Sequence, residues 1–241
     1  MSSQRPPRIM LIHALREAVQ PVHDAFAAAW PEAKAYDLLD TSLSDDLSAD
    51  GGLTERMIAR FRTLGRYAAD AGSAAGGTDA ILFTCSAFGP AIEAVKADLG
   101  IPVLKPNEAA FAEALRLGPK IALVVSFQPA LALMAAELRA MAQEAGRDLR
   151  LEVQVVPDAL AALKAGDGDR HDALIAGAVR ALPSVDAVVL GHFSMARAAA
   201  QVAATTAAPV LTTPTSAVSL LRRLLTAPPS STGPSREHAH A

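Results

Sequence analysis

Cys85 and His192 are the two residues whose types and positions most strongly suggest chemistry. Cys85 is the only cysteine, and it follows the apolar run 80–83. His192 follows a similar run at 187–190, so segment 185–195 resembles segment 78–88 at an offset of 107 positions. Thiol and imidazole groups can both give or take a proton in proteins near neutral pH. The pairing predicts one acid/base site built between two related halves.

The similarity between the two halves extends beyond these segments. The further matches pair 101–104 with 208–211 at the same offset, 7–12 with 119–124 at 112, and 20–21 with 128–129 at 108. A small drift in the offset is expected because loops tolerate insertions and deletions. Four matches in the same order predict an internal duplication.

Short apolar runs alternate with amphipathic patterns along the chain, which predicts βα units and a largely parallel sheet in each half. We expect strands at 8–13, 34–39, 80–84, 103–104, 120–126, 150–156, 187–190 and 210–212. We expect helices over 53–71, 129–145 and 171–182, where apolar residues recur at spacings of three and four. The predicted fold class is therefore α/β.

Composition limits the functional classes. A hydrophobic fraction of 51% allows a large core, and a net charge of −3 gives no reason to expect binding to nucleic acid or to an anionic membrane. A single cysteine excludes an intrachain disulfide framework. No apolar stretch reaches the roughly 18 residues of a membrane span, which favours a soluble, cytoplasmic protein. The tail at 227–241 is rich in Pro and Ser and is expected to be disordered.

Several cofactor motifs are missing from the sequence. No G-x-G-x-x-G or P-loop motif is present, the histidines and the cysteine do not have zinc-site spacing, and there is no G-x-S-x-G nucleophile motif. The sequence therefore gives no support for a nucleotide cofactor or a zinc site.

Cys85 is expected at the junction of a buried strand and a helix that begins near Ser86. In open α/β sheets, ligands bind beyond the carboxyl ends of the strands. A helix N-terminus at that point favours negative charge, so we expect the pKa of the Cys85 thiol to be lowered. The alternative is an inert buried cysteine, which is common in protein cores.

Other polar residues end or follow neighbouring strands and are expected to line the same cleft. The candidates for substrate binding are His13, Thr84, Ser86, Ser126, Ser194 and Thr213. Their side chains could hold a substrate carboxylate. Two alternatives are that His13 faces solvent at a strand end and that Ser194 only caps a helix.

The segment Thr84-Cys85-Ser86 resembles the first thiol motif of the aspartate/glutamate racemase superfamily, and 191–193 falls where the second thiol motif would stand. This group includes glutamate, aspartate and hydantoin racemases, maleate isomerase and arylmalonate decarboxylase, and the resemblance extends to about Leu225. It implies two pseudo-symmetric domains with the active site in the cleft between them, cofactor-free chemistry next to a carboxylate, and a possible homodimer. The domains would be 1–106 and 107–214, with a final helix at 215–226 packing back on the first. The chain departs from the pattern because His192 replaces the second thiol.

The resulting functional prediction is a cofactor-independent racemase or epimerase acting on a small carboxylate-bearing substrate, an amino acid or a derivative. Cys85 and His192 would serve as the acid/base pair on opposite faces of the reacting carbon. One alternative is a decarboxylase, another lyase, or an isomerase of a small (di)carboxylate that uses Cys85 alone. A further alternative is a non-catalytic protein that binds a carboxylate.

Overall fold

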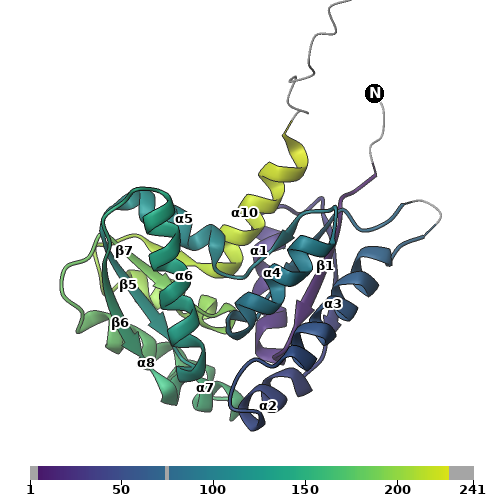
Figure 1. The fold of residues 1–241 in the computed structure, drawn as a ribbon. Coiled ribbons are helices and arrows are strands. Elements are labelled where there is room, and N and C mark those ends of the chain that lie inside the picture. The colour runs from purple at the N-terminus through teal and green to yellow at the C-terminus, as the bar shows by residue number, and fades with distance from the viewer. Residues whose placement is uncertain (1–4, 74–75, 228–241) are drawn as a thin grey trace, which may run out of the picture.

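The computed structural model describes residues 5–73 and 76–227 and contains two four-stranded parallel sheets (Figure 1). The first sheet has the order β2-β1-β3-β4, from β1 (Arg8–His13), β2 (Lys34–Leu39), β3 (Ala80–Phe83) and β4 (Val103–Leu104). The second has the order β6-β5-β7-β8, from β5 (Lys120–Val125), β6 (Arg150–Val155), β7 (Ala187–Leu190) and β8 (Val210–Thr212). Each predicted strand is confirmed to within one residue at its end. Apart from Ala227, the tail predicted to be disordered lies outside the described residues.

Strand order and pairing repeat between the two sheets. Arg8 pairs with Lys34 at the start of β1 and β2, and Lys120 pairs with Arg150 at the start of β5 and β6. The central pairs β1–β3 and β5–β7 are also parallel. The carboxyl ends of β1 and β3 therefore lie side by side in one sheet, as do those of β5 and β7 in the other.

Helices cover both faces of each sheet (Figure 1). They are α1 (Val19–Ala29), α2 (Ser42–Ala49), α3 (Glu55–Asp70), α4 (Gly89–Asp98), α5 (Glu108–Leu117), α6 (Leu131–Glu144), α7 (Pro157–Lys164), α8 (Gly168–Arg180), α9 (Ala199–Ala203) and α10 (Thr213–Thr226). The predicted helices at 53–71, 129–145 and 171–182 correspond to α3, α6 and α8. Helix α8 begins earlier than predicted because the Asp167 carboxylate caps its first turn by accepting the Arg170 N–H at 3.0 Å.

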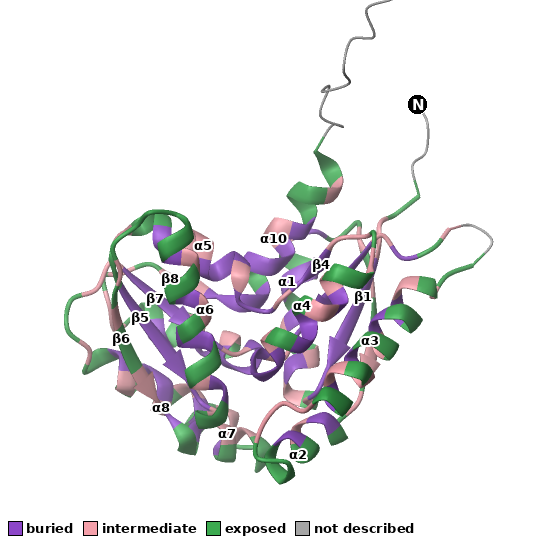
Figure 2. Ribbon diagram, in the orientation of Figure 1, coloured by how far each residue is buried: buried purple, intermediate pink, exposed green. Residues whose placement is uncertain are grey.

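The buried core continues from one half into the other, as the buried strands of both sheets in Figure 2 indicate. Its central cluster joins Ile12 and Phe83 of the first sheet to Leu123 and Val189 of the second. Two outer clusters lie beneath α1 and α10 in the first half and beneath α8 and α9 in the second. Removing this apolar surface from water stabilises each half and its contact with the other.

Helix α10 follows the last strand of the second sheet but packs on the first half. Its residues Val218 and Leu221 belong to the same outer cluster as Ile9 of β1. Arg222 also donates a hydrogen bond to the carbonyl of Ala29 at the end of α1, at 2.8 Å. The last helix therefore joins the second half to the first.

Each central strand leads into a short 3-10 turn before its helix begins. The turns are η1 (Arg16–Ala18), η2 (Ser86–Phe88), η3 (Gln128–Ala130) and η4 (Phe193–Ala198). The residues directly before them are Leu15, Cys85, Phe127 and His192. The helical segment expected to start near Ser86 does begin there, but its first turn is the 3-10 turn η2, and the α-helix α4 begins at Gly89.

Candidate active site

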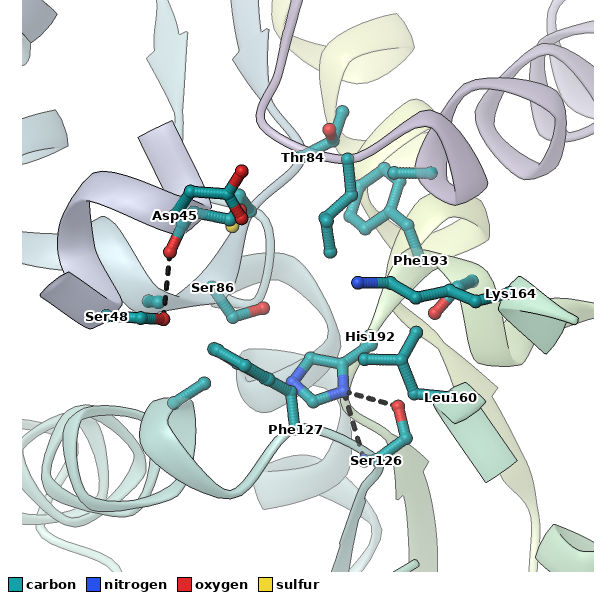
Figure 3. Close-up of a pocket in the computed structure, with 17 residues that line it drawn as sticks. Asp45, Ser48, Thr84, Ser86, Ser126, Phe127, Leu160, Lys164, His192 and Phe193 are labelled. Atoms are coloured by element: carbon teal, nitrogen blue, oxygen red, sulfur yellow. Dashed lines mark hydrogen bonds between the residues drawn. The ribbon is translucent and has the colours of Figure 1, made fainter. Parts of the chain in front are cut away.

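A cavity of about 120 Å³ lies where the strand ends of the two halves meet (Figure 3). The four residues that precede the 3-10 turns, Leu15, Cys85, Phe127 and His192, all line it. Of the residues proposed from the sequence, Thr84, Cys85, Ser86, Ser126, His192 and Ser194 also line it. The two strand ends identified from the internal similarity thus contribute to one pocket.

His13 is fully buried, so the expectation that it faces solvent is wrong, and it is not among the residues that line this cavity. It is fully buried on the same face of β1 as Ile9 and Leu11, because side chains alternate between the faces of a strand. Its Nδ1 lies 2.8 Å from the Thr84 Oγ1, and its Nε2 lies 2.9 Å from the Asp37 carboxylate. Burial lowers the pKa of His13 and outweighs the opposing effect of Asp37. His13 therefore reaches the pocket only through Thr84.

Thr213 also lies away from the cavity. It is the first residue of α10 and is fully buried. The Thr213 hydroxyl has no hydrogen-bond partner among the described residues. The expected contact between Thr213 and a substrate is therefore not supported by its position.

The Cys85 thiol is half-buried in the cavity wall. Burial raises its pKa to about 11, although a hydrogen bond from the Ala87 main-chain N–H acts in the opposite direction. The expected lowering of this pKa is wrong because removal of the thiol from water disfavours the charged thiolate more than the Ala87 N–H stabilises it. Near neutral pH, Cys85 is a protonated thiol.

The His192 imidazole is held by Ser126 of the neighbouring strand end (Figure 3). Its Nδ1 accepts a hydrogen bond from the Ser126 main-chain N–H at 3.1 Å, and the Ser126 hydroxyl donates to the same nitrogen at 3.1 Å. Burial lowers the pKa of His192 to about 4. The ring is therefore neutral near pH 7, with its proton on Nε2.

The Ser86 hydroxyl connects the two halves beside this histidine. It lies 3.1 Å from the Asn107 Oδ1 and 3.2 Å from the carbonyl oxygen of Gly191, the residue before His192. Gly191 lies close to the core of the second half, because a Cβ there would be 2.6 Å from the terminal methyl group of Met134, which would have to move, and 3.2 Å from the Val124 carbonyl oxygen. These contacts fix the main chain of the second strand end against the first half.

Two charged residues in the pocket were missed by the sequence argument. Asp45 of α2 and Lys164 of α7 line the cavity, and Figure 3 shows them on opposite sides of it. Both lie on helices that follow an outer strand, α2 after β2 and α7 after β6. A motif search could not find them, because an exposed Asp or Lys on a surface helix is common. Their place at the pocket depends on how the two halves pack.

The part of the chain that the structure describes contains neither a metal-binding cluster nor a membrane-spanning helix. There, no group of three or more His, Cys, Asp or Glu side chains could hold a metal ion. Within the same residues, no helix is long and apolar enough to cross a membrane.

The fold and the pocket define a two-part α/β protein with its candidate site between the carboxyl ends of two parallel sheets. Residues 14–221 match the family model described as Asp/Glu/Hydantoin racemase. The chain therefore belongs to the Asp/Glu/hydantoin racemase family. No curated protein sequence matched the chain significantly.

Solved structures of racemases share this fold. Glutamate racemase isoform RacE1 from Bacillus anthracis superposes with a TM-score of 0.67 at 11% identity, covering 92% of this chain and 82% of that one. Allantoin racemase from Pseudomonas fluorescens gives a TM-score of 0.65 at 20% identity and covers 90% of both chains. Aspartate racemase from Picrophilus torridus gives 0.66 at 13% identity, covering 90% of this chain and 94% of that one. At these identities the similarity shows the common fold.

Proposed function

We propose that the protein is a cofactor-independent racemase or epimerase, an isomerase that moves a proton at a carbon next to the carboxylate of an amino acid or derivative. Family membership supports this class of reaction. The observation that carries the proposal is that Cys85 and His192, which follow the corresponding strands β3 and β7, line the same cavity. A pocket with a polar group from each half can act on the two sides of one small molecule.

Cys85 is the group that moves the proton in this proposal. Its thiolate takes the proton from one face of the reacting carbon and becomes a thiol, which leaves a carbanion delocalised into the carboxylate. A proton from water at the opposite face then gives the other enantiomer, and the thiol serves as the donor in the reverse direction. With a pKa of about 11, only about one thiol in ten thousand is ionised at pH 7. The main-chain N–H of Ala87 is the group that favours the thiolate, although burial outweighs it. A thiolate with a high pKa is also a strong base, which suits a weakly acidic C–H group.

The size and lining of the cavity fit a small carboxylate. Its volume of about 120 Å³ corresponds to about four water molecules at about 30 Å³ each. Lys164 supplies a positive charge, and Ser126 and Ser194 supply hydroxyl groups. A preorganised donor aimed at developing negative charge can lower a barrier by about 3–4 kcal/mol.

A cofactor-free decarboxylase is the second candidate, and the protonation state of Cys85 favours it. Loss of CO₂ from a substrate carboxylate leaves a carbanion, which needs one proton donor and no base. Near neutral pH Cys85 already carries the proton that such a carbanion would take. A decarboxylase would therefore use the protonated Cys85 thiol directly, whereas a racemase must first remove the proton from this thiol.

Incubation in deuterated water distinguishes these reactions. The protein would be tested against amino acids, hydantoins, malonates and dicarboxylates. A racemase introduces deuterium into the unchanged substrate with loss of optical activity, whereas a decarboxylase releases CO₂ and forms one enantiomer of the product. We expect Cys85→Ala to abolish turnover while its thermal unfolding stays close to that of the wild type. Full activity of this variant would overturn the proposal.

A further inference from the structure

The two nitrogens of the His192 ring have different surroundings. Nδ1 accepts two hydrogen bonds from Ser126, whereas Nε2 is buried and has no partner among the described residues. We propose that His192 is a fixed Nε2–H hydrogen-bond donor to a substrate oxygen, not a proton carrier, and that Ser126 is the residue that positions it. This inference rests on the proposed function, because it takes the ligand to be a carboxylate.

The main-chain N–H of Ser126 decides the tautomer. An amide proton cannot be removed near neutral pH, and this one points at Nδ1 across an N···N distance of 3.1 Å. A proton on Nδ1 would place two hydrogens between the same two nitrogens, which would break the hydrogen bond and bring like partial charges together. The neutral ring must therefore keep its proton on Nε2, and the imidazolium form is opposed.

The sheet fixes the orientation of the ring. Ser126 follows β5 and His192 lies beyond the end of the neighbouring strand β7, and the Gly191 N–H donates to the Val124 carbonyl at 2.9 Å. A half-turn of the ring would replace Nδ1 by a carbon and lose both hydrogen bonds from Ser126. Because strand pairing sets the distance between the two residues, the Nε2–H bond has one preferred direction.

The unpartnered Nε2–H group identifies the kind of atom that should bind there. A buried donor without an acceptor costs about 1–3 kcal/mol, which an acceptor oxygen would recover. The other ionisable groups that line the pocket are Cys85, Asp45 and Lys164. Burial opposes a positive charge on His192, and the Lys164 ammonium in the pocket lining attracts a carboxylate. A carboxylate oxygen, or the charge that develops on it during proton transfer, is therefore the acceptor that fits.

This role separates the two strand-end residues by task. Cys85 exchanges the proton, and His192 stabilises the oxygen on which negative charge accumulates. The acid/base pair predicted from the sequence is then reduced to one acid/base group and one neutral donor. Proton exchange at the face opposite Cys85 would depend on water.

Nitrogen NMR tests the tautomer without a substrate. The full chain, labelled with ¹⁵N at its histidine rings, would be titrated between pH 8 and 5, and the His192 signals would be assigned by their loss in His192→Gln. We expect Nε2 protonated and Nδ1 unprotonated throughout this range. A proton on Nδ1, or a titration midpoint near 6.5, would overturn the inference. If His192→Gln fails to fold, through-bond correlations to the ring carbons assign the wild-type signals.

Two substitutions test the donor role in the deuterium-exchange assay. His192→Gln keeps a side-chain N–H group but cannot titrate near neutral pH, whereas His192→Ala removes the donor. We expect His192→Gln to stay within about tenfold of the wild type and His192→Ala to lose about 10²–10³-fold. Equal losses in both variants would show that His192 carries a proton. A wild type that turns over no substrate would count against the proposed function, while the NMR result would still decide the tautomer.

Discussion

His13 ends a strand of the first sheet and His192 follows a strand of the second, and the two imidazoles differ in how completely their ring nitrogens are paired. Both ring nitrogens of His13 have partners, Thr84 at 2.8 Å and Asp37 at 2.9 Å. His192 has partners only at Nδ1. A complete network holds the fold, whereas an incomplete one leaves a polar atom for a ligand. His171 also has an unpartnered Nε2 but does not line the cavity, so the unpaired nitrogen points to function at His192 only together with its place in the cavity wall.

Substituting each histidine by alanine should separate the two roles most clearly. His13→Ala leaves a fully buried void and removes one hydrogen-bond partner each from Thr84 and Asp37, so we expect a loss of about 3–4 kcal/mol in the free energy of unfolding. His192→Ala removes a ring that lines an existing cavity and an unpaired donor, and should cost about 1 kcal/mol. Urea unfolding measures both values. Equal losses would remove the distinction.

The pH dependence of stability should depend on both histidines. Each has its pKa lowered by burial, to about 4 for His192, so the unfolded state binds more protons than the folded state below about pH 6.5. Stability should therefore fall as the pH drops from 6.5 toward 4, by up to about 1.4 kcal/mol per pH unit for each group.

A substitution at His192 measures how much this residue contributes to the change in the free energy of unfolding with pH. In urea titrations at several pH values, His192→Gln should lose stability less steeply on acidification than the wild type. His13, which faces Asp37 and through it His23, should retain its own share in that variant. Identical slopes for the two proteins would mean that His192 is not held neutral by its surroundings.

The sequence predicted the sheets well because local signals determine them. Apolar runs bounded by turn residues located all eight strands, and the repeat placed Cys85 and His192 at corresponding strand ends. Since the carboxyl ends of parallel strands share an edge, their presence in one pocket followed from the topology. The position of His13 could also have been predicted. Side chains alternate along β1, so His13 lies on the same face as Ile9 and Leu11.

The properties that depend on packing could not be predicted in this way. The pKa of Cys85 depends on burial by residues distant in sequence, such as those of the second half that line the same cavity. Asp45 and Lys164 reach the pocket only because α2 and α7 lie close to it when the halves assemble (Figure 1). The tautomer of His192 depends on a main-chain N–H group of another strand end.

Asp37→Asn tests the His13 network more gently. The asparagine oxygen can still accept the His13 Nε2–H, but the charge that also holds His23 is lost. We expect a cost of about 1–2 kcal/mol in the free energy of unfolding. The exposed Asp148, which forms no ion pair with the described residues, supplies the matched control: Asp148→Asn should change stability by less than about 0.5 kcal/mol. If both variants behave alike in urea unfolding, the network adds little to the fold.

Ser126→Ala should have the smallest effect, because it removes only one of the two groups that hold His192. The hydroxyl is lost, but the main-chain N–H still donates to Nδ1 and keeps the proton on Nε2. We expect deuterium exchange within about threefold of the wild type, corresponding to about 0.7 kcal/mol, and an unchanged ¹⁵N pattern for the ring. A proton on Nδ1 in this variant would show that the hydroxyl, not the main chain, sets the tautomer. The direction of the His192 Nε2–H bond would then depend on a side chain and not on the main chain of the sheet.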